Sequence, residues 1–401
     1  MDGLLKEPVR QRRPFRGFGP TSVAYGRAAL HALSVSAHDP AAWRREIRQR
    51  CPTRPGVYGM IDADEHLIYV GMSKQLRQRL LSYFTGNDDR SKQYRIAQHA
   101  KRLVWETAGH ELTAQLRELE LIRRWRPRFN AVGRPRRQRL GYIYLTVTDA
   151  PQFRVGPLPA RYCQHFWGPV PLGWRTRDAV ERLNLVFRLR TCSQATPMRF
   201  SDQRDLFEMD RTAACLRNDV GSCLAPCAGQ CTRSQYTASI QAAQALLEGR
   251  DSSVLDRLQA EMTSAAAANC FERAALLRDA REELTYLLEQ IEWLRDVQQH
   301  YWFVYPVPGS ARRMVWKLIA GGELAAVVRE PVDEASRRRC RQMLDRVFDP
   351  PVRPDFEHTG DLAQMRTIAS WFRRYPDQME QVLDIDQARH RCVGHFDPIE
   401  C

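Results

Sequence analysis

The sequence predicts an α+β protein composed of several domains. The length of 401 residues exceeds that of one ordinary domain. Two β-rich runs precede two amphipathic helices, and a group of cysteines precedes a further helical segment. The expected architecture is a small antiparallel sheet flanked by helices, a cysteine-rich linker, a helical hairpin and a small α+β C-terminal region.

Composition narrows the possible environments and partners. No apolar run reaches the roughly 18 residues needed to cross a bilayer, and no apolar segment follows the basic start of the chain. We therefore expect a cytoplasmic protein without a membrane partner. The net charge of +14 favours a polyanionic partner such as DNA. Because only five of the 61 basic residues are lysine, a general arginine bias weakens the argument from charge alone.

Residues 1–50 are expected to form a basic N-terminal extension that begins as a loose arm, because Pro14 and Gly17 interrupt its arginine-rich start. Residues 51–150 are expected to form the first folded domain. At 56–73 the sequence GVYGMIDADEHLIYVGMS contains two β-rich runs around a polar connection, which is typical of a hairpin.

Two helices and a strand are expected in the rest of this first domain. The helices cover residues 75–84 and 111–125, and the strand covers 141–147. In the longer helix Glu118 lies about 40° from Ile122, at the edge of the apolar stripe. Its carboxylate should therefore be half buried beside the sheet.

Residues 151–235 are expected to form a connector with a cysteine cluster. The clustered cysteines are Cys215, Cys223, Cys227 and Cys231, with Cys192 upstream. Because thiols stay reduced inside cells, this density indicates a metal or iron-sulfur centre rather than disulfides. Buried apolar thiols are the alternative interpretation.

The remaining chain predicts a helical hairpin and a small C-terminal region. Helical patterns over 254–268 and 271–294, with a short break between them, place the hairpin within residues 236–295. Residues 296–401 begin with a β-hairpin pattern around Gly321 and Gly322 and continue as helices. The sequence assigns no role to this last region.

The stretch 56–130 resembles the GIY-YIG nuclease domain, and more closely the N-terminal domain of the UvrC excinuclease family. The motifs that carry the resemblance are GVY at 56–58, IYVG at 68–71, LRQRLLSYF with Arg79 and Tyr83, and ELELIRRWRPRFN with Glu118 and Asn130. Their order and spacing together are specific, whereas no single motif is.

The resemblance continues beyond the nuclease region. HFWGPV and FRLRTC are similar to the connector of the family, CLRNDVGSCLAPCAG to its cysteine segment, and FERAALLRD to the UVR motif that binds the excinuclease B subunit. The RNase H-like second nuclease and the helix-hairpin-helix domains of full-length members are not recognisable. The chain thus resembles Cho-type homologues with one nuclease, with the UVR hairpin kept.

The resemblance implies a metal-dependent DNA endonuclease that makes a single incision, on the 3′ side of a lesion, during nucleotide excision repair. A divalent cation, Mg²⁺ or Mn²⁺, would bind Glu118. Tyr69 would act as general base, and Arg79 would hold the scissile phosphate. Tyr58 and Tyr83 would add phenolic hydrogen bonds. Asn130 would orient the metal-bearing helix or touch the substrate.

One position departs from the family pattern. Met72 stands where the family usually has lysine, directly after the motif glycine, and Lys74 is a possible substitute. The alternative hypothesis is therefore a catalytically impaired adaptor that keeps the DNA and partner surfaces. A stand-alone homing or restriction nuclease is disfavoured, because the similarity continues through the cysteine segment.

The resemblance also implies a cluster and a partner. The implied ligands of a 4Fe–4S cluster, with zinc as the less favoured metal, are Cys192, Cys215, Cys223 and Cys227. An excinuclease B-like subunit would dock on Phe271, Glu272, Ala274, Ala275, Arg278 and Asp279. The alternative for these helices is a core element without a partner.

Overall fold

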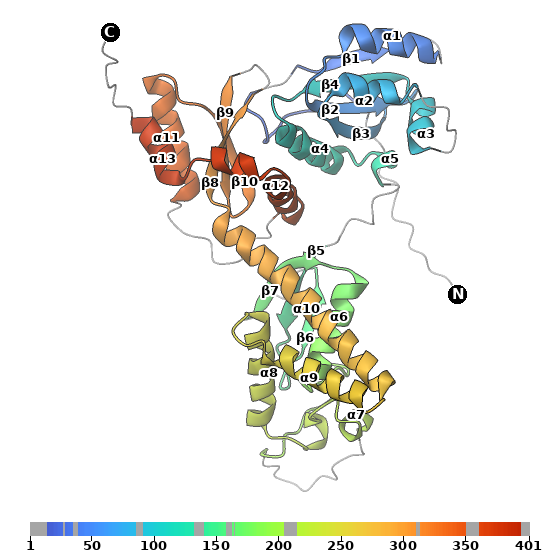
Figure 1. Cartoon of the computed structure of the whole chain (residues 1–401), viewed down its shortest axis with the longest axis vertical. Coiled ribbons are helices and arrows are strands. Elements are labelled where there is room, and N and C mark those ends of the chain that lie inside the picture. Colours follow the sequence, from blue (N-terminus) through green and yellow to red (C-terminus); the bar gives the residue numbers. More distant parts are fainter. Residues whose placement is uncertain are drawn as a thin grey trace. The chain divides into compact units, whose positions relative to one another are not determined.

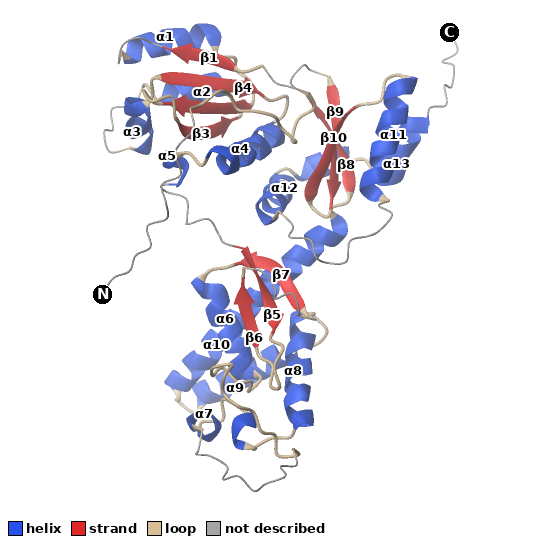
Figure 2. Cartoon of the chain, turned by 180° about the vertical axis from the view of Figure 1, so that it is seen from behind, coloured by secondary structure: helices blue, strands red, loops and turns tan. Residues whose placement is uncertain are grey.

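The computed structural model describes residues 14–26, 29–34, 39–85, 91–131, 140–157, 163, 165–203, 215–309, 313–349 and 361–393. The chain divides into two compact units, one formed by residues 1–135 and 297–401 and the other by residues 136–296. Helices and strands occur in both units, as expected for an α+β protein (Figures 1 and 2). None of the described helices has the length and apolar character needed to cross a membrane.

The first unit contains a four-stranded antiparallel sheet. Its strands are β1 (His31–Ser34), β2 (Gly56–Ile61), β3 (Leu67–Ser73) and β4 (Arg102–Thr107). Their order is β1-β4-β2-β3, so β3 lies at an edge. The predicted hairpin is confirmed as β2 and β3, paired so that Tyr58 lies opposite Gly71.

The N-terminal region is more ordered than the sequence predicted. Phe15 and Phe18 are buried against the sheet, and β1 pairs with β4. Helix α1 (Pro40–Arg50) buries Trp43 and Ile47. The prediction of a loose arm is therefore wrong for the described residues after 13, because apolar side chains spaced among the arginines join the core. Residues 1–13 lie outside the described part.

Helices cover both faces of this sheet. Helices α2 (Leu76–Ser82) and α3 (Lys92–His99) pack with α1 on the face that carries Tyr58. Helix α4 (Glu111–Trp125) packs on the face that carries Val57 and Val70. The short helix α5 (Arg128–Ala131) follows α4. The structure confirms the predicted bounds of α4, but the sequence analysis did not anticipate α3 or β4.

The C-terminal part of the first unit is a three-stranded antiparallel sheet with helices. Its strands are β8 (Phe303–Pro308), β9 (Met314–Ala320) and β10 (Glu323–Arg329), in the order β10-β9-β8. The predicted hairpin is β9 and β10, and its tight turn uses Gly321 and Gly322 at positive φ. The helices are α11 (Glu334–Phe348), α12 (Leu362–Arg374), η2 (Pro376–Gln381) and α13 (Ile385–Val393).

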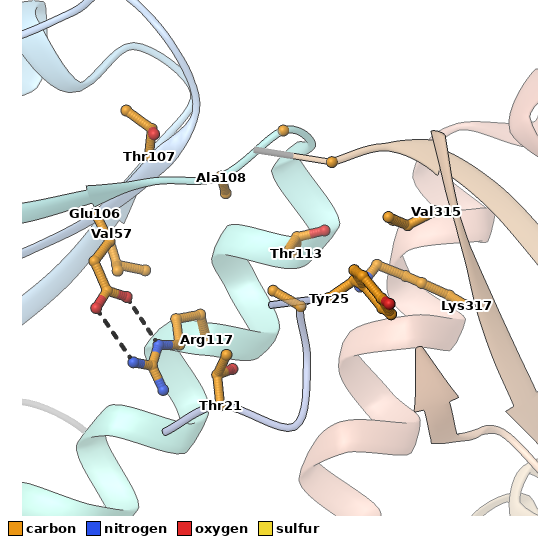
Figure 3. Close-up of a pocket in the computed structure, with 13 residues that line it drawn as sticks. Thr21, Tyr25, Val57, Glu106, Thr107, Ala108, Thr113, Arg117, Val315 and Lys317 are labelled. Carbon is orange, nitrogen blue, oxygen red and sulfur yellow. Dashed lines mark hydrogen bonds and ion pairs between the residues drawn. The ribbon is translucent and has the colours of Figure 1, made fainter. Parts of the chain in front are cut away.

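Helix α4 is buried from two sides. Ala114 and Leu121 pack on its own sheet, whereas Leu112 and Leu116 share a core cluster with residues of β8, β9 and α12. Between these two apolar faces the buried Arg117 donates to Glu106 at 3.1 Å (Figure 3). It also bonds Glu120 and the carbonyls of residues 19 and 20. The C-terminal region thus completes the packing of α4.

The second unit contains a separate three-stranded sheet. Its strands β5 (Leu140–Leu145), β6 (Phe153–Gly156) and β7 (Phe166–Pro171) have the order β6-β5-β7. Its helices are α6 (Trp174–Val186), α7 (Leu216–Asp219), η1 (Pro226–Ala228), α8 (Arg233–Leu247), α9 (Ser253–Ala267) and most of α10 (Phe271–His300).

Two predicted domain boundaries change as a result. Strand β5, assigned by sequence to the domain at 51–150, hydrogen-bonds to β6 and β7, so the structural boundary lies near 135. The connector and the helical hairpin, predicted as separate domains, share one hydrophobic core that extends from Ile143 to Ile291. The physical reason is that neither the small sheet nor the hairpin buries enough apolar surface alone.

Acidification should destabilise the first unit through His110, the N-cap of α4. Its Nδ1 accepts a hydrogen bond from the Leu112 amide at 3.3 Å, and burial lowers the pKa of His110 to about 4. The unfolded chain protonates histidine below about pH 6.5. The free energy of unfolding should therefore fall between about pH 6.5 and 4, by up to about 1.4 kcal/mol per pH unit from this group.

Urea unfolding across this pH range tests the expectation. His110→Asn should show a shallower pH dependence than the wild type, because asparagine can cap the helix without titrating. His99→Asn, which changes an exposed imidazole, should keep the wild-type slope. Equal slopes in all three proteins would contradict the assignment.

Candidate active site

Three of the predicted tyrosines gather on one face of the sheet. Tyr58 lies on β2, Tyr69 on β3 and Tyr83 at the end of α2. Their ring centroids are 6.0 to 6.3 Å apart, and the hydroxyls of Tyr58 and Tyr83 are 3.0 Å apart. Tyr58 and Tyr83 are buried, whereas Tyr69 is half exposed. Tyr69 is thus the member of the cluster with access to solvent.

Glycine at position 71 makes this cluster possible. A Cβ atom built on Gly71 would lie 2.5 Å from the Tyr58 hydroxyl and 2.6 Å from its ring. Any side chain at position 71 would therefore collide with the ring of Tyr58 on the neighbouring strand β2. The glycine of the IYVG motif is required for close approach of the ring, not for an unusual backbone angle.

Arg79 links the two buried tyrosines. Its Nε donates to the Tyr58 hydroxyl at 3.1 Å and its Nη2 to the Tyr83 hydroxyl at 3.5 Å. Burial raises the pKa of Tyr58 and of Tyr83, so both phenols stay protonated at neutral pH. In the described part of the chain no carboxylate forms an ion pair with Arg79. The guanidinium therefore keeps its charge available for an anion.

Asn130 fastens the strand that carries Tyr69. Its Oδ1 accepts from the Val70 amide at 2.8 Å, and its Nδ2 donates to the Val70 carbonyl at 2.7 Å. Because Asn130 is buried and both ends of its amide are used, it acts as a positioning residue. It holds β3 to α5, and its predicted contact with the substrate or the metal-bearing helix stays a prediction.

Glu118 is half buried on α4, as the helical wheel predicted. It shares a helical face with Ala114 and Leu121, which pack on the sheet. A single carboxylate that solvent can still reach suits a hard divalent cation, which retains several waters and accepts phosphate oxygens. The donor chemistry therefore fits the predicted cation.

Neither Met72 nor Lys74 supplies a positive charge beside the tyrosines in place of the family lysine. Met72 packs among apolar residues on the sheet face opposite Tyr58. Lys74 pairs with Glu111 at 2.9 Å and donates to the Tyr375 hydroxyl, so it does not take the place of the family lysine. Lys92 lies outside the sequence motifs, and its Nζ lies 5.7 Å from the centroid of the Tyr69 ring. The rarity of lysine was the one available signal.

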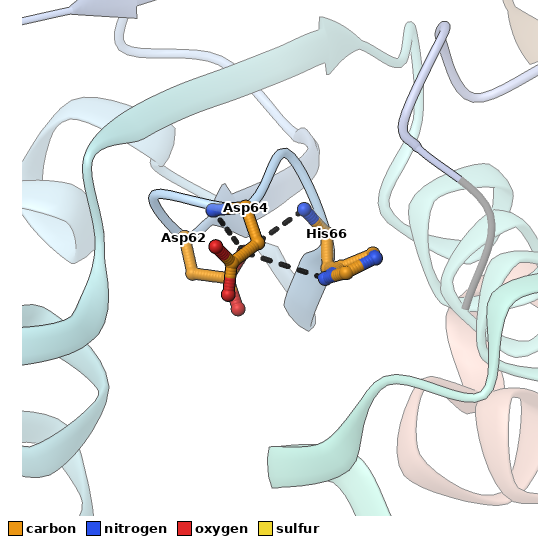
Figure 4. A group of neighbouring side chains, drawn as sticks. All are labelled: Asp62, Asp64 and His66. Carbon is orange, nitrogen blue, oxygen red and sulfur yellow. Dashed lines mark hydrogen bonds and ion pairs between the residues drawn. The ribbon is translucent and has the colours of Figure 1, made fainter. Parts of the chain in front are cut away.

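An acidic group at the β2–β3 turn has a structural explanation. Potential ligand atoms of Asp62, Asp64 and His66 lie within 4.8 Å of one another (Figure 4). Asp62 Oδ1 already accepts from the amides of Asp64 at 3.2 Å and His66 at 2.9 Å. Arg128 lies 3.5 Å from Asp62 Oδ2. The carboxylate thus caps the hairpin turn, and we assign it no further role.

Cys223 and Cys227 lie close enough to the other predicted cysteine ligands for their thiols to interact electrostatically. Burial raises the pKa of Cys223, and the thiols of Cys215, Cys227 and Cys192 raise it further. The pKa of Cys227 is raised in the same way by burial and then by Cys215 and Cys192. Thiolates are ligands that zinc and iron-sulfur clusters take, but among the described residues no three of these sulfur atoms lie within 4.8 Å of one another. Cys231 is also buried, and burial raises its pKa to about 11.

The helical hairpin exposes part of the predicted partner surface. Phe271 is 66% exposed at the start of α10, and the neighbouring Leu276 is 61% exposed. Arg278 is exposed and pairs with Asp279 at 2.7 Å. Ala274, by contrast, is buried. The other two predicted positions differ, with Glu272 exposed and Ala275 half buried.

Comparison with known proteins gives two adjacent family matches. The UvrC-like GIY-YIG domain matches residues 54–131, and the middle domain of UvrC/Cho excinucleases matches residues 142–246. UvrABC system protein C of Alcanivorax borkumensis is 33% identical over 230 residues, or 57% of this chain and 36% of that protein. The homologue of Pseudomonas fluorescens is 31% identical over 260 residues, or 65% and 39%. The chain therefore spans less than two fifths of the length of these relatives.

A solved structure also matches the first domain. It is the GIY-YIG N-terminal endonuclease domain of UvrC from Thermotoga maritima, bound to its catalytic divalent cation, magnesium. It is 33% identical, and the match covers 21% of this chain and 96% of that one, with a TM-score of 0.20.

Removing the Asn130 amide should loosen β3. Asn130→Ala leaves the amide and carbonyl of Val70 without partners in a buried site, which should lower the free energy of unfolding by about 2 kcal/mol or more. Hydrogen exchange at Val70 should accelerate together with this loss. Asn184→Ala is the matched control, because Asn184 forms the same pair of bonds with Phe153 in the second unit. Unchanged exchange at Val70 in Asn130→Ala would contradict the positioning role.

Proposed function

Because the chain carries a UvrC-like GIY-YIG domain followed by the middle domain of UvrC/Cho excinucleases, we propose that it is a metal-dependent endonuclease of nucleotide excision repair. It makes one incision in damaged DNA, on the 3′ side of the lesion. The observation that carries the proposal is the arrangement of Tyr58, Tyr83 and Arg79 around the half-exposed Tyr69.

Tyr69 and Arg79 have different roles in the proposed hydrolysis. Tyr69 in its phenolate form takes a proton from the attacking water and becomes a neutral phenol, since its two neighbouring phenols stay protonated and cannot accept one. A free phenol is a weak base at neutral pH, so positive charge beside Tyr69 favours this step. Arg79 offers its remaining N–H donors to the oxygens of the scissile phosphate.

Glu118 would hold the divalent cation, Mg²⁺ or Mn²⁺. When bound there, the ion would supply positive charge to the phosphoryl oxygens and the leaving group. Strand β3 forms the edge of the sheet, so groups on its two faces can approach one substrate beyond that edge. This placement supports a shared site for the tyrosine cluster and the carboxylate of α4.

An excinuclease B-like subunit would deliver the enzyme to lesions. The exposed Phe271 and Leu276 offer an apolar contact at one end of α10, and the ion-paired Arg278 borders it. Specificity would then come from this partner and from deformation of the DNA rather than from readout of bases.

A nicking assay tests the proposal. The full chain with Mg²⁺ or Mn²⁺, on a damaged duplex loaded with the B subunit, should produce one nick. Tyr69→Phe and Glu118→Ala should each slow it at least about 100-fold, as loss of a proton acceptor or of metal charge does. Persistent nicking by both variants would refute the site, and assays without the B subunit measure the dependence on the partner.

The second candidate is an impaired adaptor, and the apolar Met72 is the observation that favours it. In this case the wild type binds damaged DNA and the B subunit without cutting. Met72→Lys in the same assay separates the two candidates: cutting by Met72→Lys alone supports the adaptor, and cutting by the wild type supports the enzyme.

We also propose a 4Fe–4S cluster on Cys192, Cys215, Cys223 and Cys227, with zinc as the competing metal. Anaerobically purified protein should contain iron and sulfide, and Cys223→Ser should lose both, because thiolates are the ligands. Cys231→Ser removes the neighbouring buried thiol and should retain both. A colourless wild-type protein with stoichiometric zinc would overturn the choice of iron.

A further inference from the structure

We propose that Lys92 is a second phosphate-binding cation of the active site, which contacts the scissile phosphate together with Arg79. The inference rests on the proposed nuclease function and deepens it. It assigns a substrate contact to a helix that lies outside all the sequence motifs of the nuclease domain.

The fold directs Lys92 toward the tyrosine cluster. The Ser91 hydroxyl caps α3 by accepting from the Tyr94 amide at 3.1 Å, which fixes where the helix begins. Ile96 is buried in the same core cluster as Tyr58. Lys92 lies four residues before Ile96 and therefore on the same helical face. Its ammonium consequently lies over the Tyr69 ring, 5.7 Å from the centroid.

No carboxylate in the described part of the chain neutralises the charge of Lys92. Within the described residues no carboxylate forms an ion pair with Lys92 or with Arg79. Lys74, in contrast, is paired with Glu111. Two cations that no described carboxylate pairs with lie next to a half-exposed Tyr69 and form a receptor for an anion, and a phosphodiester supplies that anion in the proposed reaction.

The ammonium group of Lys92 supplies a mobile positive charge, which Arg79 does not. Arg79 already donates to the hydroxyls of Tyr58 and Tyr83, so the orientation of its guanidinium is fixed. An ammonium is a compact charge with three donors on a flexible stem, so Lys92 can follow the phosphate as charge develops on its oxygens. The competing explanation is a solvated lysine whose stem only covers the Tyr69 ring, and this explanation predicts no effect on the chemical step.

A matched pair of variants decides between the two explanations. Lys92→Gln and Arg95→Gln each remove one positive charge from α3, but Arg95 is exposed, and among the described residues the hydrogen bonds and cation–π contacts of the tyrosine cluster do not involve it. In single-turnover nicking by the full chain, Lys92→Gln should lower the rate of cleavage about 100-fold. Arg95→Gln should weaken only DNA binding, by the amount expected from one lost charge. Lys92→Arg should restore much of the rate, because it restores the charge.

The outcomes separate this inference from the proposed function. If the wild type nicks and Lys92→Gln nicks at the same saturating rate, the role of Lys92 is overturned while the nuclease stands. If the wild type does not nick, the proposed function fails, and affinity for the damaged duplex without divalent cation becomes the test. A larger loss of affinity in Lys92→Gln than in Arg95→Gln then supports the phosphate contact, and equal losses overturn it.

Discussion

The pairing register of β2 and β3 is the constraint on which the site depends. It places Tyr58 opposite Gly71, and only a residue without a side chain leaves room for the ring to reach Tyr83 and Arg79. The same register turns Tyr69 toward this cluster and Met72 toward the other face. A shift by one residue would exchange the two faces, and the bonds from Asn130 to Val70 oppose that shift.

Helix α4 connects this constraint to the rest of the first unit. Its own sheet covers one face and the C-terminal strands and α12 cover another, with Arg117 held between them by Glu106 and Glu120. Buried charge is tolerated there because the guanidinium donates to two carboxylates and to the carbonyls of Gly19 and Pro20. The region to which the sequence assigned no role thus supports the helix that carries Glu118.

Positively charged side chains have different partners inside and outside the candidate site. Outside the site, Arg117 and Arg128 pair with carboxylates. Inside it, Arg79 donates to a tyrosine hydroxyl and Lys92 lies over a tyrosine ring. Net positive charge therefore says little about the substrate, and the position of uncompensated charge says more. The cysteines show a weaker form of grouping: Cys223 and Cys227 interact electrostatically with the other two predicted ligands, and the metal centre stays a prediction.

The sequence by itself determined the β2–β3 hairpin and helix α4, and it supplied the candidate site residues, whose roles stay predictions. The alternating β-rich runs and the apolar stripe of α4 depend on neighbours within one strand or helix turn. Tyr58, Tyr69 and Glu118 are recognised from short motifs and their order along the chain. Tertiary structure alone decided that β5 belongs to the second unit, that the C-terminal region covers α4, and that Lys92 approaches Tyr69. These are contacts between segments distant in sequence, and no local periodicity encodes which partner buries an exposed edge or face.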